Sequence, residues 1–345
     1  MVRGNGKLAH KSKPKPTAKK PEPQNASDYI PRDVPLELQQ RCLKIFRETF
    51  DPGDQDSALL QEVKGHLFLR DFAAAFGQEQ YLRVYASRWS PSRALGYVQV
   101  LGDVEEHLMT GRSGDEYEQQ PFRIVCLGGG AGAEVVALAG WMHLRSDKMV
   151  ENVQSEFIDI AAWDSVISDL HRALTTPPEL SKYASAIARQ TNTAMVAQDQ
   201  YAANFQQLDA LQIGDDKFET LCSNAALVTL MFTLNELYSS SMPKTQQMLS
   251  KLKSSMKAGA CLLVVDSPGS YSTVSINGTE KKYPMQWLLD YTLIGPQQDS
   301  SPKWQKLVSD DSRWFRLPQG LKYPIELENM RYQIHLYRRN SDEQG

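Results

Sequence analysis

The spacing of hydrophobic positions changes near residue 120. Between Pro35 and about Leu108 apolar residues recur at helical spacing, and beyond residue 120 short apolar runs of strand length alternate with helical patterns. Strands are expected at 124–127, 155–160, 202–208, 226–232, 260–265 and 332–338, the last at a sheet edge, and helices from Ala133, at 166–174 and at 245–256 with Gly259 as the stop. The pattern predicts an α/β fold with a doubly wound, mainly parallel sheet over 120–340, preceded by a helical accessory region at 31–115.

A buried strand ends in a glycine-rich turn at residues 128–132, within the run FRIVCLGGGAGAE. Glycine lets the backbone turn sharply and lets a ligand approach, and the following helix presents free N–H groups. Gly128, Gly130 and Ala133 satisfy the G-x-G-x-x-A pattern of dinucleotide enzymes, whereas Gly128, Gly130 and Gly132 satisfy the G-x-G-x-G pattern of S-adenosylmethionine (SAM) enzymes. The turn, Gly129 included, therefore predicts a nucleotide cofactor without deciding which one.

Carboxylates follow the second and third expected strands, at the edge where a parallel sheet binds ligands. Asp159 can accept hydrogen bonds from ribose hydroxyls, with Asp164 as a competitor, and Asp209 can take an amino group such as that of adenine. Each of these carboxylates can instead be a helix cap. A dinucleotide enzyme needs one acid about 20 residues past the turn, and Asp159 lies further on, which is awkward for either cofactor.

Composition narrows the function classes. The 345 residues are 41% hydrophobic and can bury a full core, and no apolar stretch has the length of a membrane helix. The four cysteines and six histidines are scattered, so we expect neither disulfides nor a metal site. Residues 1–24 carry a net charge of +6 and the remainder −9, which predicts a disordered basic tail over 1–30. Such a tail can be a nuclear or nucleolar address, an RNA-touching arm or a solubilising segment of a cytoplasmic protein.

Arginines and aromatic residues crowd around Pro91. Arg88, Trp89 and Arg93 can bind nucleic acid or close over a cofactor, and a packed helix junction is the competing interpretation. A second basic stretch, residues 303–339, carries a local net charge of +4 and includes Arg331. Because the body of the chain is acidic, RNA contacts are expected at such local patches.

Five blocks in one order resemble the fungal 25S ribosomal RNA uridine-N3-methyltransferases: VYASRWSPSRALGY, VCLGGGAGAE, LVTLMFTLNELY, LLVVDSPGSYS and LKYPIELENMRYQIHLYRR. The likeness runs from about Tyr81 to Arg339. It implies a class I, Rossmann-like methyltransferase whose glycine turn binds SAM, with Asp159 and Asp209 holding the nucleoside. It also implies large-subunit ribosomal RNA or a pre-ribosome as the partner.

Methylation of uridine N3 requires removal of a proton. Glu236 is expected to be the general base, Asn235 to bond O2 or O4 of the ring, and Asp266 to be a reserve base. These residues follow the fourth and fifth expected strands, on the ligand side of the sheet.

The target uridine must be reached outside a helix, so a flipped or loop uridine is expected to stack on Trp89, Tyr238 or Tyr271. Methylation at C5 would instead need a cysteine nucleophile, and Cys222 lacks such a setting. Two other classes stay open: a NAD-binding oxidoreductase, and a non-catalytic RNA-binding module on a methyltransferase fold.

Overall fold

The computed structural model describes residues 29–53, 56–110, 120–145, 152–269, 271–276, 279–295 and 303–341. For 271–276 and 279–282 the description covers the backbone alone. The predicted basic tail falls almost wholly on residues 1–28 and lies outside the described residues, as does the side chain of Tyr271.

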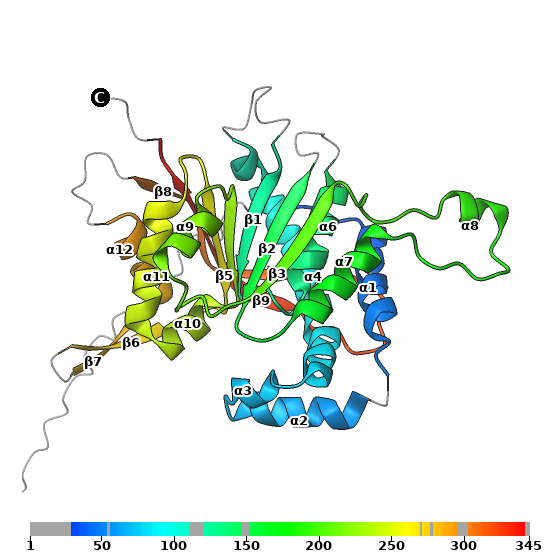
Figure 1. The fold of residues 1–345 in the computed structure, drawn as a ribbon, viewed down its shortest axis with the longest axis horizontal. Coiled ribbons are helices and arrows are strands. Elements are labelled where there is room, and N and C mark those ends of the chain that lie inside the picture. Colours follow the sequence, from blue (N-terminus) through cyan, green and yellow to red (C-terminus); the bar gives the residue numbers. More distant parts are fainter. Residues whose placement is uncertain are drawn as a thin grey trace, which may run out of the picture. The chain divides into compact units, whose positions relative to one another are not determined.

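A seven-stranded sheet forms the centre of the fold, in the order β3-β2-β1-β4-β5-β9-β8 (Figure 1). Its strands are β1 Phe122–Leu127, β2 Val153–Asp159, β3 Tyr201–Gln207, β4 Leu227–Met231, β5 Cys261–Asp266, β8 Trp304–Phe315 and β9 Met330–Arg339. Strands β1 to β5 are parallel, and β8 and β9 are antiparallel to their neighbours. A separate hairpin pairs β6 Tyr271–Ile276 with β7 Thr279–Pro284. The predicted doubly wound, mainly parallel sheet is confirmed, and the carboxyl ends of β1 to β5 share one edge.

Helices cover both faces of the sheet (Figure 1). They are α1 Leu36–Phe50, α2 Ser57–Phe68, α3 Phe72–Ala75, α4 Glu79–Met109, α6 Ala133–Leu144, α7 Asp164–Thr175, α8 Ala186–Gln190, α9 Asp215–Cys222, α10 Leu234–Ser240, α11 Met242–Ser255 and α12 Met285–Leu293. One buried cluster joins α1, α4, α6 and α7 to the sheet, and a second joins α9 to α12 to the opposite face. Among the helices of the described ranges, none has the length and hydropathy needed to cross a membrane.

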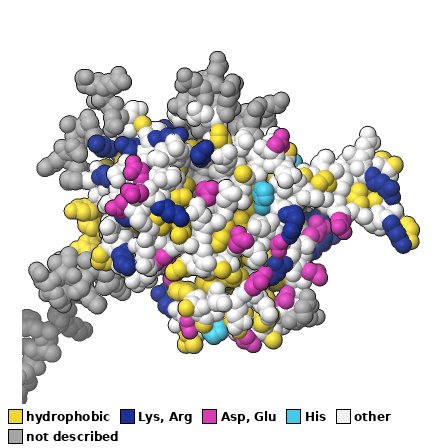
Figure 2. Space-filling view, in the orientation of Figure 1, with side chains coloured by type: hydrophobic (Ala, Val, Ile, Leu, Met, Phe, Trp, Pro, Cys, Tyr) yellow, Lys and Arg dark blue, Asp and Glu magenta, His cyan; other side chains and the backbone are white. Residues whose placement is uncertain are grey.

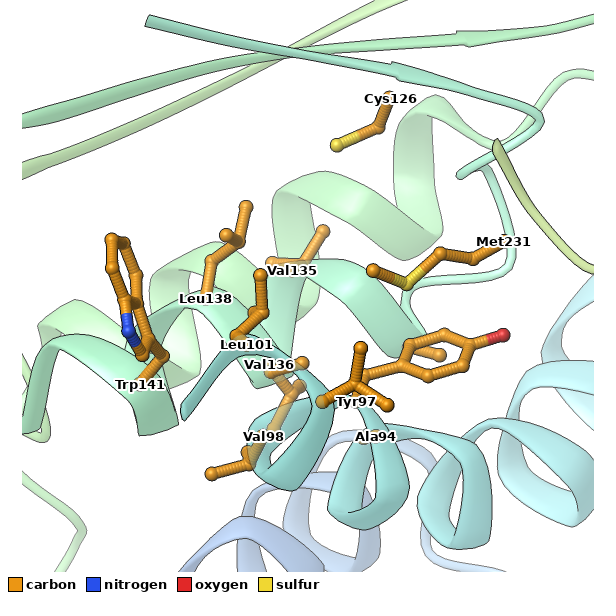
Figure 3. Packing of buried hydrophobic residues seen from close by; sticks show 14 of the residues in the cluster. Ala94, Tyr97, Val98, Leu101, Cys126, Val135, Val136, Leu138, Trp141 and Met231 are labelled. Carbon is orange, nitrogen blue, oxygen red and sulfur yellow. The ribbon is translucent and has the colours of Figure 1, made fainter. Parts of the chain in front are cut away.

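Helix α4 packs directly on α6. Figure 3 shows Val98 and Leu101 of α4 among the same buried side chains as Val136 of α6. A Cβ atom at Gly140 would lie 2.8 Å from Val98 Cγ2, so this glycine permits the close approach of the two helices. Residues from Arg32 onward form one compact unit, and the N-terminal helices therefore share a core with the sheet.

The C-terminal strands differ from the expected pattern. Strand β9, expected at an edge, lies between β5 and β8, and its Tyr332, Ile334 and Leu336 are fully buried, as an internal strand requires. The edge on this side of the sheet is β8, a strand that was not predicted. Strand β8 lacks a regular alternation of apolar and polar residues. Its register shifts at 306–308 and 310–313, and it contains a run of charged and polar residues.

The structure excludes one competing interpretation and shifts one expected helix end. Helix α4 continues through Pro91, so the crowded arginine and aromatic segment is one helix face and not a helix junction. Helix α11 ends at Ser255 with Met256 as its C-cap. Gly259 instead adopts a φ of 79° in the turn that leads into β5.

Candidate active site

The glycine turn joins β1 to α6 through left-handed backbone. Gly128 has a φ of 81° and Gly132, the N-cap of α6, a φ of 82°, a region that side chains with a Cβ rarely adopt. The N–H of Gly128 donates to Ile158 O at 2.7 Å, and the N–H of Gly130 donates to Asp159 Oδ2 at 3.2 Å. The end of β2 therefore holds the turn in place.

Side chains crowd the turn so closely that a Cβ is excluded. At Gly130 a Cβ would lie 2.0 Å from Trp163 Cδ1, and at Gly128 it would lie 2.2 Å from Thr233 Oγ1. At Gly129 it would lie 2.7 Å from the Glu134 carboxylate. These contacts tie the turn to the start of α7 and to the residues that precede α10.

Asp159 lies at the turn, as predicted. Its Oδ1 accepts from the N–H of Ala161 at 3.1 Å, while its Oδ2 accepts from Gly130. Burial raises the pKa of this carboxyl, and the backbone hydrogen bonds partly oppose the rise. Asp159 thus presents a carboxylate beside the turn, where ribose hydroxyls would need an acceptor.

The other two predicted cofactor carboxylates have different settings. Asp209 is half-buried just beyond β3 and accepts from the N–H of Leu211 at 2.9 Å and from the side chain of Gln212. The N–H of Leu208 donates to Asp159 O at 2.8 Å, which places the ends of β2 and β3 side by side. Asp164 is exposed as the first residue of α7, with Trp163 at the N-cap. Its charge suits the helix dipole there.

Glu134 is a site residue that sequence reasoning missed. It is 4% exposed, and its Oε1 accepts from the hydroxyl of Thr229 at 2.5 Å. Burial raises the pKa of Glu134 to about 7. The sequence signal that could have identified Glu134 is an acidic residue two positions after Gly132, in the otherwise apolar start of α6.

These residues fit a nucleoside cofactor. The turn has no Cβ at three positions, the N-terminus of α6 points its free N–H groups into the turn, and carboxylates end β2 and β3. Such a set provides acceptors for hydroxyl and amino groups and N–H donors at the start of α6.

The three predicted catalytic residues come together beside the turn. Asp266 is 2% exposed, and its oxygens accept from the N–H of Asn235 at 3.0 Å and of Ser267 at 2.7 Å. Burial raises the pKa of Asp266 to about 6, against these hydrogen bonds; the charge of Glu236 adds to the rise and that of Arg93 opposes it. Glu236 Oε2 is buried and has no hydrogen-bond partner among the described residues. Since Thr233 touches Gly128, this corner adjoins the predicted cofactor turn.

A pocket of about 170 Å³ brings together the four predicted RNA-contact residues. It is formed by one face of α4, Phe232 after β4, and residues 328–331, and its lining includes Arg88, Trp89, Arg93 and Arg331. Arg88 forms an ion pair with Glu328, and the guanidinium of Arg93 lies 4.9 Å from the centroid of the Phe232 ring. Ser90 Oγ donates to Ala131 O at 2.5 Å, which ties this part of α4 to the glycine turn.

Other predicted RNA contacts have structural roles instead. Tyr238 is 5% exposed and accepts a hydrogen bond from Gln246, so the expectation that it stacks on a base is wrong. Within the stretch 303–339, Lys306 pairs with Asp290 at 2.7 Å and Arg338 donates to His107 O. Basic and acidic side chains are interspersed over the face shown in Figure 2. RNA contacts on that face would rest on local groups of residues.

Comparison with known proteins identifies the family. Residues 46–338 match the family model described as "Putative SAM-dependent methyltransferase". The 25S rRNA (uridine(2843)-N(3))-methyltransferase of Saccharomyces cerevisiae is 32% identical over 329 residues, which cover 87% of this chain and 86% of the yeast protein.

Solved structures give weaker likenesses. A SAM-dependent methyltransferase from Methanosarcina mazei is 12% identical, with a TM-score of 0.36 over 65% of this chain and 95% of that one. The N-methyltransferase NodS from Bradyrhizobium japonicum is 9% identical, with a TM-score of 0.35 over 73% of this chain and 98% of that one. Scores this low add nothing to the assignment, which rests on the family match and the yeast relative. The chain belongs to this family of SAM-dependent methyltransferases, together with the yeast enzyme.

Proposed function

We propose that the chain transfers a methyl group from SAM to N3 of a uridine in large-subunit ribosomal RNA. The observation that carries the proposal is Oε2 of Glu236, which is buried without a hydrogen-bond partner among the described residues, three residues after the Thr233 that packs against Gly128. A buried carboxylate oxygen without a donor is costly, and the N3–H of uracil is a donor that would satisfy it. The name of the yeast relative, a uridine-N3-methyltransferase acting on 25S rRNA, supports the same reaction.

The chain's residues would act on the uracil ring. When bound, SAM supplies a methyl group on a positively charged sulfur. Glu236 takes the N3 proton, and the side-chain amide of Asn235 donates to a ring carbonyl oxygen. SAM held at the glycine turn with Asp159 and Asp209 would supply the methyl group to the deprotonated N3, and the electron pair of the broken carbon–sulfur bond would stay on sulfur. Alignment and exclusion of water supply most of the remaining rate enhancement.

The hydrogen bonds of the two candidate bases support Glu236 over Asp266. Both oxygens of Asp266 accept backbone N–H groups, so this carboxylate holds the first turn of α10 and positions Asn235 and Glu236. Glu236 keeps one oxygen for a substrate proton. We therefore assign the base to Glu236 and a positioning role to Asp266.

Nucleoside mass spectrometry tests the reaction and the substrate together. The full chain is incubated with SAM and unmodified large-subunit ribosomal RNA, and N3-methyluridine is quantified after digestion. We expect N3-methyluridine with the wild type and its loss in Glu236→Ala and Asn235→Ala, with the exposed Glu219→Gln as the matched control. Absence of N3-methyluridine from wild-type reactions and unchanged levels in cells lacking the gene would overturn the proposal.

Ligand-induced thermal shifts separate the other function classes. S-adenosylhomocysteine is expected to raise the melting temperature of the full chain, and NAD and NADH are expected to leave it unchanged. A shift with nicotinamide cofactors alone would favour an oxidoreductase. A shift with S-adenosylhomocysteine but no methylated product would favour a non-catalytic RNA-binding module.

We also propose that the chain meets its RNA in a pre-ribosome in the nucleolus. The net charge of +6 on residues 1–24 is the supporting observation. Fluorescence imaging of the full chain and of a variant lacking residues 1–28 tests this location. Equal cytoplasmic signal from both would contradict it.

A further inference from the structure

Arg93 brings an unusually free guanidinium to the pocket. A guanidinium has five N–H donors, and in the part of the chain that the structure describes, the hydrogen bond of Arg93 is a long one of 3.5 Å to the hydroxyl of Tyr85. No carboxylate of those residues forms an ion pair with it, in contrast to Arg88 on the same pocket wall. Arg93 is half-buried, so water also reaches it less than it would an exposed arginine.

Phe232 supports this guanidinium in a strained backbone conformation. Its φ of 58° is rare for a bulky residue, and its N–H donates to Val265 O at 2.7 Å. Such strain is typical of functional sites. The left-handed backbone of Phe232 turns the chain at the end of β4. As a result the Phe232 ring lies against the Arg93 guanidinium, and Thr233 packs against Gly128.

The acceptor of Glu236 and the donors of Arg93 belong to the same corner of the fold. Glu236, in the first turn of α10, follows Phe232 by four residues, and the charges of both Glu236 and Arg93 act on the buried carboxyl of Asp266. Tyr85 and Tyr97 are the other titratable groups that face Arg93. Arg93 and Phe232 line the pocket, and Glu236 does not, so the pocket wall brings unused donors and an aromatic side chain to the corner that holds the Glu236 acceptor.

This combination matches one edge of one pyrimidine. Uracil presents the N3–H donor between two carbonyl acceptors, whereas cytosine presents an acceptor at N3 that would face the Glu236 carboxylate unpaired. A cavity of about 150 Å³ holds a benzene ring, so a pocket of about 170 Å³ has room for a single pyrimidine. Trp89 lines the pocket and is the aromatic side chain expected to stack on the base.

We propose that this pocket receives the target uracil and that Arg93 donates a hydrogen bond to a ring carbonyl oxygen, stabilising the negative charge that develops as N3 loses its proton. The inference rests on the proposed uridine methylation and adds a catalytic residue to it. The proton passes from N3 to Glu236, Arg93 stays protonated throughout, and the positive charge of the guanidinium faces the ring oxygen on which the anion concentrates. When that oxygen is O4, the same donor selects uracil over cytosine, which carries an amino group at that position.

A substrate with a more acidic N3 tests the role of Arg93. RNA with uridine or 5-fluorouridine at the modified position is compared in Arg93→Gln, Arg93→Lys and wild type. Arg93→Gln should lower kcat on uridine about 100-fold, the usual loss for one oxyanion donor, and much less on 5-fluorouridine, because fluorine already favours the N3 anion. Arg93→Lys should fall between them. The exposed Arg172→Gln, on α7, is the charge-matched control and should keep the wild-type rate.

Fluorine NMR gives a readout that does not depend on turnover. With S-adenosylhomocysteine bound, the 19F signal of 5-fluorouridine RNA reports ionisation of N3, and the midpoint should lie at lower pH in wild type than in Arg93→Gln. Equal losses of kcat on both substrates with unchanged midpoints would overturn the inference and leave Arg93 as an RNA-binding residue. If Arg93→Gln does not fold, Arg93→Lys carries the same comparison. A wild type without N3-methyluridine product contradicts the proposed function itself, whereas active wild type with an equally active Arg93→Gln contradicts the Arg93 role alone.

Discussion

The hydroxyl of Tyr323 donates a hydrogen bond of 2.7 Å to the carbonyl oxygen of Ser87, inside α4. Ser87 O would normally accept from the N–H four residues later, but that residue is Pro91, which has none. The Tyr323 side chain thus replaces the missing helical donor. This replacement explains how α4 continues through a proline and keeps Arg88 and Arg93 on one helix facing the pocket.

Tyr323→Phe removes that donor with little change in shape. Because Ser87 is buried, we expect a loss of about 1 to 2 kcal/mol in the free energy of unfolding, the cost of an unsatisfied carbonyl. Urea denaturation measures it, with Tyr183→Phe, a change at an 82% exposed tyrosine, as control. Equal stability of the two variants would show that Ser87 O finds another donor.

Glu134→Gln should change how stability depends on pH. The folded-state pKa of about 7 exceeds the ordinary 4.5, so the folded protein keeps a proton that the unfolded chain releases. Wild-type stability must therefore fall as pH rises from about 4.5 to 7. The neutral glutamine removes this slope and should stabilise the fold by about 2 kcal/mol more at pH 8 than at pH 5. Urea denaturation at both pH values measures the difference.

The exposed Glu179→Gln is the control for that titration. This substitution also replaces a carboxylate by a neutral amide, but at an exposed position. Its effect on stability should therefore be small at both pH values. A stability difference between Glu134→Gln and wild type that is the same at pH 5 and pH 8 would show that Glu134 does not titrate in this range.

The sheet and the cofactor turn were predictable because their signals are local. Strands β1, β4 and β5 are largely buried on both faces and appear as apolar runs, so they were predicted within a few residues of their ends. Asp159 and Asp266 end β2 and β5, and Asn235 follows the end of β4 after three residues. Strand β8 was missed because it is an edge strand with bulges and exposed charges, which leave no simple period.

The pocket could not be predicted because its parts meet through tertiary packing. Arg93 on α4, Phe232 after β4 and Met330 on β9 are far apart in the chain. The separate roles of Asp266 and Glu236 depend on which backbone N–H groups each carboxylate reaches, and that depends on the folded turn of α10. Residue types suggested the chemistry, and the hydrogen bonds in the fold support the proposed roles.

Gly130→Ala tests the cofactor turn. The new methyl group would lie 2.0 Å from Trp163 Cδ1, and Trp163 is held between Phe76 at 5.4 Å and Tyr85 at 5.8 Å. The turn must therefore shift, and the Gly130 N–H must leave Asp159. We expect at least about a tenfold loss of affinity for S-adenosylhomocysteine by calorimetry, or about 1.4 kcal/mol.

Gly65→Ala is the matched control for that glycine. Nothing lies within 4 Å of a Cβ at this position in α2, so the change should keep affinity and stabilise the helix by up to about 1 kcal/mol. Circular dichroism checks that both variants fold. Wild-type affinity in a folded Gly130→Ala would contradict the assignment of the cofactor to this turn.

Glu236→Gln should mainly lower the reaction rate, whereas Asp266→Asn should mainly lower the stability of the fold. Glutamine at 236 keeps the shape of the side chain but cannot take a proton, so N3-methyluridine formation should fall by about 100-fold or more at unchanged melting temperature. Asparagine at 266 leaves one acceptor for two backbone N–H groups, those of Asn235 and Ser267, and should destabilise the fold by about 1 to 2 kcal/mol. Its rate loss should be smaller, because the base is still present. A greater loss of rate in Asp266→Asn than in Glu236→Gln, at equal S-adenosylhomocysteine binding, would identify Asp266 as the general base instead of Glu236.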